Sequence, residues 1–94
     1  MNDFLGKLTK AGELHKISIT KTIMEETGMA AGKMITFEVR KATPPYQVII
    51  PTLQTKIKRF GREIGVSVPS IFVITGILHR HTIYKLRIVE NKLS

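Results

Sequence analysis

The chain has no cysteine and no tryptophan, and Asp3 is its one aspartate. Without cysteine no disulfide can form, which excludes the small secreted scaffolds held by disulfides and favours a reducing, cytoplasmic location. The apolar stretch 66–78 has no charged residue, but it contains Pro69 and Gly76 and is shorter than the roughly 20 apolar residues that a membrane span needs. The N-terminal residues 1–10 lack an apolar segment, so we expect no signal peptide and no membrane partner.

Catalytic and metal-binding patterns are also scarce. With one aspartate, no cysteine and no glycine-rich phosphate loop, the sequence offers no set of nucleophile, base and orienting group, so we expect no enzyme activity. His79 and His81 form a His-x-His pair, but a metal site needs three or four ligands and His15 is the other histidine. We therefore expect neither a metal nor another cofactor.

What the chain has in excess is positive charge. Its 94 residues include 15 Lys or Arg and 7 Asp or Glu, giving a net charge of +8. The length fits one domain, and 43% hydrophobic residues are typical of a folded one. Most of the excess charge lies in the second half of the sequence. Such a balance indicates an anionic partner, most often nucleic acid.

Periodicity predicts strands in the first half of the chain. Residues 7–20 are typical of a hairpin that turns at Gly12, because Ile17 and Ile19 alternate with polar residues. Residues 21–27 form a short helix between the cap Thr20 and Gly28. Strands follow over 35–39 and 46–50.

The second half predicts a helix followed by two strands. Leu53, Ile57, Phe60 and Ile64 recur at helical spacing, so a helix is expected from Pro51-Thr52 to about Ile64. Residues 70–78 are nearly all apolar, as in a strand that is covered on both faces or lies in a dimer interface. A last amphipathic strand covers 83–89. The expected class is α+β.

The run from Leu8 to Val39 resembles the swapped-hairpin AbrB/MazE/SpoVT DNA-binding domain family. Thr9-Lys10 and Gly12 match its basic hairpin, Thr27-Gly28-Met29 its helix exit, and Gly32-Lys33 its turn into the next strand. The helix departs from the family: Thr20 stands at its usual starting proline, and neither Met24 nor Glu25 offers a basic DNA contact. The resemblance implies a β-barrel with short helices that two chains complete by exchanging hairpins, hence a homodimer or higher oligomer.

These patterns divide the chain into an AbrB-like domain, 1–51, and a C-terminal helix and β-hairpin extension, 52–94. A degenerate second repeat is the alternative, because Phe37–Pro51 can be laid on Gly6–Thr20. The appended extension is favoured over the repeat, since the identities in that overlay are few.

The predicted function is an AbrB-like transcriptional regulator that binds double-stranded DNA through a basic β-hairpin, a ribbon wide enough for the major groove. The alternative is an antitoxin whose N-terminus binds DNA and whose C-terminus binds a toxin protein, although such tails are usually acidic and residues 52–94 are basic. A solvated strand or helix face is the structural alternative for the lysines and arginines. The candidate DNA-binding residues are Lys7, Lys10, Lys16, Lys21, Arg40, Lys41, Lys58, Arg59 and Arg62.

Overall fold

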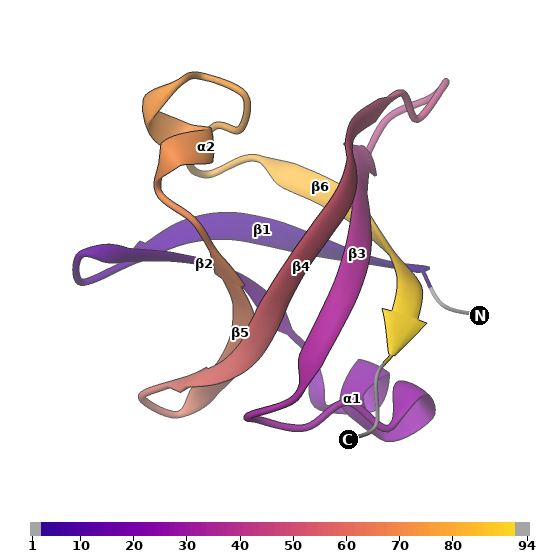
Figure 1. The fold of residues 1–94 in the computed structure, drawn as a ribbon, viewed down its shortest axis with the longest axis vertical. Helices are drawn as coiled ribbons and strands as arrows, with labels where there is room; N and C mark the ends of the chain where they lie inside the picture. Colours follow the sequence, from indigo (N-terminus) through magenta and orange to yellow (C-terminus); the bar gives the residue numbers. More distant parts are fainter. Residues whose placement is uncertain (1–2, 92–94) are drawn as a thin grey trace.

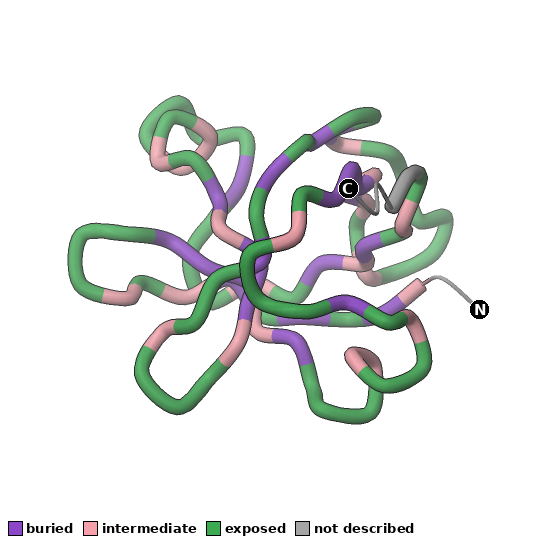
Figure 2. The backbone as a smooth tube through the Cα atoms, turned by 60° about the horizontal axis from the view of Figure 1, so that its bottom comes forward, coloured by how far each residue is buried: buried purple, intermediate pink, exposed green. Residues whose placement is uncertain are grey.

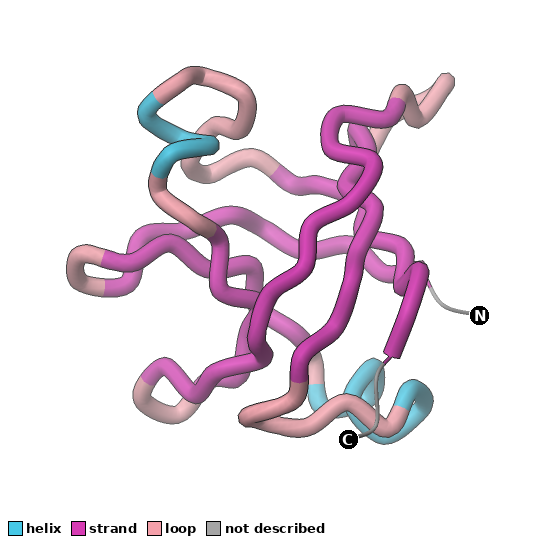
Figure 3. The backbone as a smooth tube through the Cα atoms, viewed as in Figure 1, coloured by secondary structure: helices cyan, strands magenta, loops and turns pink. Residues whose placement is uncertain are grey.

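The computed structural model describes residues 3–91 of the chain, with side chains through Val89, and they form a closed barrel of antiparallel strands (Figure 1). The strands are β1 (Asp3–Ala11), β2 (Leu14–Ile19), β3 (Met34–Lys41), β4 (Val48–Phe60), β5 (Glu63–Val68) and β6 (Ile83–Asn91), and the helices are α1 (Lys21–Thr27) and α2 (Ile71–Ile74). Around the barrel the strand order is β1-β2-β5-β4-β3-β6. The two short helices lie at the periphery (Figure 3).

Alternating side chains fill the barrel and leave the hairpin tips exposed (Figure 2). Phe4 meets Phe37 edge to face, with 6.0 Å between the ring centroids. The interior is tight: a Cβ on Gly6 would lie 2.3 Å from Cγ2 of Ile17, so glycine is required there. The buried apolar residues are Phe4, Leu8, Ile17, Ile19, Met29, Ile35, Phe37, Val39, Ile50, Leu53, Ile57, Val66, Val68, Leu78, Tyr84 and Leu86.

The barrel consists of two equivalent ββαβ units in one chain. Gly12 and Gly61 turn the two hairpins with nearly equal φ angles, 64° and 65°. Their separation in the sequence, 61 − 12 = 49 residues, also relates the other equivalent positions of the two units. Leu8 matches Ile57, and both side chains are fully buried. In the β2–β5 pair Ile17 lies opposite Val66, its own equivalent, so a pseudo-twofold axis passes between these strands.

The same backbone hydrogen bonds close both units. The Gly32 N–H donates to the Ile57 carbonyl at 2.7 Å, and the Ile57 N–H donates to the Lys33 carbonyl at 2.9 Å. In the other unit the His81 N–H donates to the Leu8 carbonyl at 2.6 Å, and the Leu8 N–H donates to the Thr82 carbonyl at 3.0 Å. The loop after each helix is therefore tied to the first strand of the other unit, and the units hold each other closed.

The helix predicted over 51–64 is wrong, because this segment forms most of β4, a turn and the start of β5. Leu53, Thr55 and Ile57 point inward at strand spacing, and Thr55 is buried because its hydroxyl donates to the Ser67 carbonyl at 2.6 Å. When Thr55 is counted as a polar residue, the alternation of buried and exposed positions along this strand cannot be seen in the sequence. Pro51, which has no N–H to donate, lies where the β3–β4 register shifts, between the Phe37 and Val39 pairings.

The strand predicted over 70–78 is also wrong. Residues 71–74 form the single turn of α2, in which the Ile74 N–H donates to the Ser70 carbonyl at 2.9 Å. Gly76 then reverses the chain with a φ of 78°. Leu78 is fully buried, but Ile74 is 78% exposed, so the segment is not covered on both faces in this chain. The helix over 21–27, by contrast, is confirmed with its Thr20 cap and its left-handed Gly28.

The architecture is therefore a strand-dominated barrel with two short helices, as the expected barrel requires, and the α+β class with a C-terminal helix is not confirmed. The boundary expected after Pro51 falls inside β4, and strands from both sides of it close one barrel. A second unit is present, but the overlay of Phe37–Pro51 on Gly6–Thr20 is wrong, since residues 55–69 are the true equivalents of 6–20. The resemblance implies that two chains complete one barrel by exchanging hairpins, whereas here a single chain supplies both units.

Candidate nucleic-acid interface

The outer face of β1, β2, β5 and β4 has basic residues on its flanks and small residues at its centre. Register places Lys58 opposite Gly65, and Gly65 opposite Ser18. Lys7 on β1 and Lys56 on β4 are both exposed and occupy equivalent positions in the two units. None of these three lysines lies within 4.0 Å of a carboxylate in the described part of the chain, which leaves their charges open to an anionic partner.

The two hairpin tips extend this basic face. Lys10 and Arg59 are equivalent residues at the ends of β1 and β4, and Arg62 lies in the second turn. All three are exposed and without a carboxylate partner among the side chains of residues 3–89. In Figure 1 the tip of the first hairpin projects to the left of the barrel and that of the second to the lower left. The basic hairpins, defined as residues 7–16 and 56–63, thus share one side of the molecule.

Lys16 is not free, although the sequence places it among the DNA contacts. Its side chain is 8% exposed, and its Nζ donates to Oε2 of Glu63 and to Oγ of Ser18, each at 2.7 Å. The charge of Lys16 is therefore neutralised by the second hairpin. It fixes β2 against the start of β5 and presents little charge to a ligand.

Lys21 joins the basic hairpins from the first residue of α1. Together with Arg62 and Ser18 it lines a shallow groove of about 470 Å³ beside the start of β5. Glu25 and Glu26, on the same helix, are exposed acids. A nucleic acid that contacts this helix would therefore meet positive charge at its start and negative charge further along.

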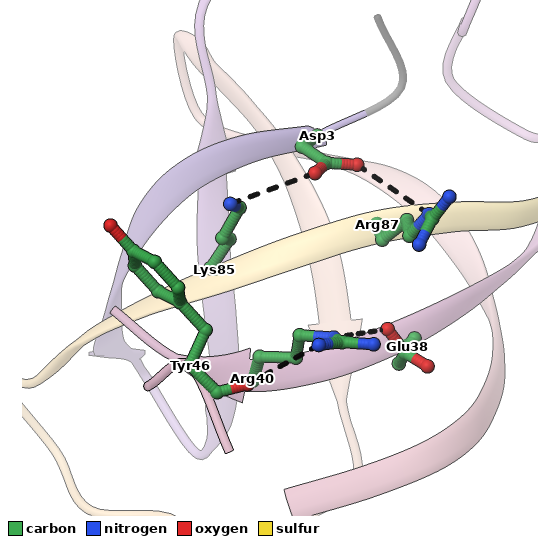
Figure 4. Close-up of polar contacts among 6 residues, drawn as sticks. All are labelled: Asp3, Glu38, Arg40, Tyr46, Lys85 and Arg87. Atoms are coloured by element: carbon green, nitrogen blue, oxygen red, sulfur yellow. Dashed lines mark hydrogen bonds and ion pairs between the residues drawn. The ribbon is translucent and has the colours of Figure 1, made fainter. Parts of the chain in front are cut away.

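Arg40 and Lys41 lie apart from the hairpins, at the end of β3 on the opposite side of the barrel (Figure 1). The Arg40 guanidinium pairs with Glu38 and lowers the pKa of that carboxyl through their hydrogen bond, which also raises the pKa of Arg40. Nearby, Lys85 and Arg87 approach the Asp3 carboxylate at 3.7 Å and 3.8 Å (Figure 4). Charges on this face are largely satisfied within the protein.

The sequence groups Lys56 with Lys58, Arg59 and Arg62 as cations of a predicted helix that could meet phosphates, but Lys56 is the member missing from the candidate DNA-binding residues given above. The residue is exposed on β4 and alternates with the buried side chains of Thr55 and Ile57. The alternation Gln54, Lys56, Lys58 is visible in the sequence, but the helical interpretation separated Lys56 from its strand neighbours.

Near the tip of the first hairpin a buried histidine contacts a part-buried serine. His15 is 5% exposed, its Nδ1 lies 3.2 Å from Oγ of Ser70, and its Nε2 has no hydrogen-bond partner among the described residues. Burial lowers the pKa of His15, and the nearby Arg80 and Lys10 lower it further. The neutral imidazole is therefore the form that the folded barrel favours.

Within residues 3–91 no three His, Asp or Glu side chains lie together as a metal would require. His79 and His81 are both exposed, and His81 has a positive φ of 63°. No helix in the same range is long and apolar enough to cross a membrane.

The six strands form a closed barrel, and comparison with known proteins finds a solved structure with a similar fold. The chain is similar to the solution structure of PHS018 from Pyrococcus horikoshii, with a TM-score of 0.72 and 12% sequence identity over 99% of this chain and 94% of that one. At this identity the likeness shows the fold alone. No family model matches the sequence, and no curated protein matches it.

Proposed function

We propose that this protein is an AbrB-like regulator that binds double-stranded DNA through its two basic hairpins. The observation that carries the proposal is the pair of equivalent cation sets, Lys7 with Lys10 and Lys56 with Arg59. All four are exposed and lack a carboxylate partner in the described part of the chain. Both hairpins therefore present positive charge at the same place on the same backbone frame.

The physical basis is phosphate neutralisation by a ribbon of suitable width. A two-stranded antiparallel ribbon fits the major groove of B-form DNA. Lysine and arginine on its flanks release condensed counterions from the phosphates, which makes binding strongly dependent on salt. Lys58, Arg62 and Lys21 widen the same basic surface. Lys16, Arg40 and Lys41 are secondary in this proposal because of their ion pairing or their position.

One chain provides both hairpins, so the proposed complex needs one chain for each DNA site. Assembly into a homodimer and binding to a toxin protein stay predictions from the sequence. Residues 52–91 form strands, turns and one short helix of the barrel, which gives the antitoxin alternative no independent support.

The proposal is tested by fluorescence anisotropy with a labelled 24-base-pair duplex at about 100 mM salt. We expect the double variant Lys56→Ala, Arg59→Ala to lose affinity roughly tenfold or more, because each lost phosphate contact removes its counterion release. The control is the double variant Lys85→Ala, Arg87→Ala, which also removes two cations, but from the ion-paired face, and should change affinity less than twofold. Equal losses in both variants would argue for unspecific charge attraction, and no binding even at low salt would overturn the proposal.

A further inference from the structure

A groove of about 610 Å³ lies between the β3–β4 connection and the start of β6, within the size range of sites for small molecules. The segments that border it, the β3–β4 connection and the start of β6, lie in the upper part of Figure 1, whereas the tips of the basic hairpins lie at the left and lower left. The connection between β3 and β4 joins the two units, so the groove has no symmetric counterpart in the described barrel. Its position separates it from the proposed DNA surface.

The floor of this groove is apolar and open to water. Val48, Ile77 and Ile83 line it, and their side chains are 37%, 45% and 50% exposed. Large branched side chains gain free energy when they leave water, about 25 cal/mol for each Å² of apolar surface. A hydrocarbon or aromatic group would cover this floor.

The polar groups of the groove favour an anion. Lys41 lines the groove, is exposed and has no carboxylate partner among the side chains described for residues 3–89, and no acidic residue is among the lining residues. The Tyr84 hydroxyl accepts the His79 N–H at 2.7 Å, and no acceptor for the hydroxyl's own O–H appears within the described chain. The site thus offers a cation and a hydroxyl donor to an oxyanion.

The outer wall of the groove is held in place before any ligand arrives. The Lys41 N–H donates to the Gln47 carbonyl at 3.0 Å, which closes the loop between them. Arg40 Nη1 donates to the Tyr46 carbonyl at 3.4 Å, and Lys85 Nζ lies 4.4 Å from the centre of the Tyr46 ring (Figure 4). The contacts of Arg40 and Lys85 with Tyr46 therefore hold the β3–β4 connection in place. A wall that is already ordered reduces the conformational entropy that is lost on binding.

We propose that this groove binds a small molecule with an apolar body and one oxyanion, such as an aromatic or aliphatic carboxylate. The body lies on Val48, Ile77 and Ile83, and the oxyanion is held by Lys41 with the Tyr84 hydroxyl. This inference is independent of DNA binding, since it uses residues that the basic hairpins do not.

The test is isothermal titration calorimetry with naphthalene-2-carboxylate and, as a neutral match, naphthalene-2-methanol. We expect saturable binding of the carboxylate, weaker binding of the alcohol by roughly three- to tenfold, and a similar loss for the carboxylate in Lys41→Gln. Ile83→Ser should weaken both probes. Lys58→Gln, an exposed cation on the other side of the barrel, should leave both unchanged.

Three results would overturn this inference. Equal binding of the charged and neutral probes would show that no oxyanion site exists. A loss in Lys58→Gln as large as in Lys41→Gln would show general charge attraction. Absence of saturation up to about 10 mM carboxylate, an affinity weaker than roughly 3 kcal/mol, would show that the groove takes no ligand of this class. Thermal melts of each variant confirm that the barrel remains folded.

Discussion

At the first hairpin tip the chain carries Lys10 and Glu13, and at the second the equivalent residues are Arg59 and Arg62. Inside the barrel the two units share equivalent buried apolar positions: Ile17 and Val66, like Leu8 and Ile57, are fully buried. Identical backbone hydrogen bonds tie both loops that follow the helices. The buried positions and the loop hydrogen bonds are therefore the shared features of the two units, whereas the exposed hairpin tips differ. The second hairpin is the more basic of the two.

The largest expected effect tests the equivalence of the two cores. Leu8→Ala and Ile57→Ala each remove a fully buried side chain at the same place in its unit. We expect each to lower the free energy of unfolding by about 2–5 kcal/mol, because a cavity adds to the lost burial. Urea unfolding measures both. A cost near zero for one of them would break the equivalence of the units.

The next effect tests whether both hairpins contact phosphates. The double variants Lys7→Ala, Lys10→Ala and Lys56→Ala, Arg59→Ala each remove two exposed cations from one unit. Each should reduce the slope of log affinity against log salt by about two units, close to 0.9 for each contact. Duplex binding between about 50 and 200 mM salt provides the slopes. An unchanged slope in either variant would assign DNA contact to a single hairpin.

A smaller effect concerns pH, because His15 is replaced by Ile64 in the equivalent position. The pKa of His15 lies below its ordinary value of 6.5 in the folded barrel, so the unfolded chain binds a proton first as the pH falls. Stability should therefore decrease on going from pH 7.5 to 5.5. The Glu38 carboxyl, with a pKa below 4.5, adds little in this window.

Thermal melts of His15→Ile across the same pH range sharpen this comparison. The variant makes the two units alike, and its midpoint should lose the part of the pH dependence that His15 supplies. His79→Gln, an exposed histidine, is the matched control and should behave as the wild type. If His15→Ile retained the full dependence, another group would be responsible.

The smallest expected effect lies in the loops, where Gly32 and His81 are equivalent and both have positive φ, 93° and 63°. Gly32→Ala should cost about 1 kcal/mol, because a Cβ disfavours this backbone region. His81→Gly should stabilise slightly, by less than about 1 kcal/mol, because relief of that strain is offset by greater freedom in the unfolded chain. Denaturant midpoints distinguish the signs. A stabilising Gly32→Ala or a clearly destabilising His81→Gly would mean that the two loops differ in conformation.

The sequence sufficed where local chemistry determines the element. The first hairpin turns at Gly12, and the helix over 21–27 begins at Thr20 and ends at Gly28, as predicted. It misled where burial depends on a distant partner. Thr55 is inside because the Ser67 carbonyl accepts its hydroxyl proton, and Pro51 is tolerated by a shift in the β3–β4 register. Neither the Ser67 carbonyl nor the register shift can be inferred from the residues next to Thr55 and Pro51 in the sequence.

The candidate site shows the same limit. The exposed positions of Lys7, Lys10, Lys58, Arg59 and Arg62 agree with the charge pattern of the sequence. The burial of Lys16 does not follow from that pattern, because Glu63 reaches it from the other unit. The repeat of Ile17-Ser18-Ile19 as Val66-Ser67-Val68 is present in the sequence, but a helix assigned over 51–64 conceals the hairpin that leads to it.

The central claim, that DNA lies across both basic hairpins, is tested most directly by titrating an isotope-labelled sample with a short duplex and following its amide resonances by NMR. The account predicts shifts concentrated at residues 7–16 and 56–63, with little change at residues 38–48. Shifts concentrated at residues 38–48, or at one hairpin alone, would contradict it.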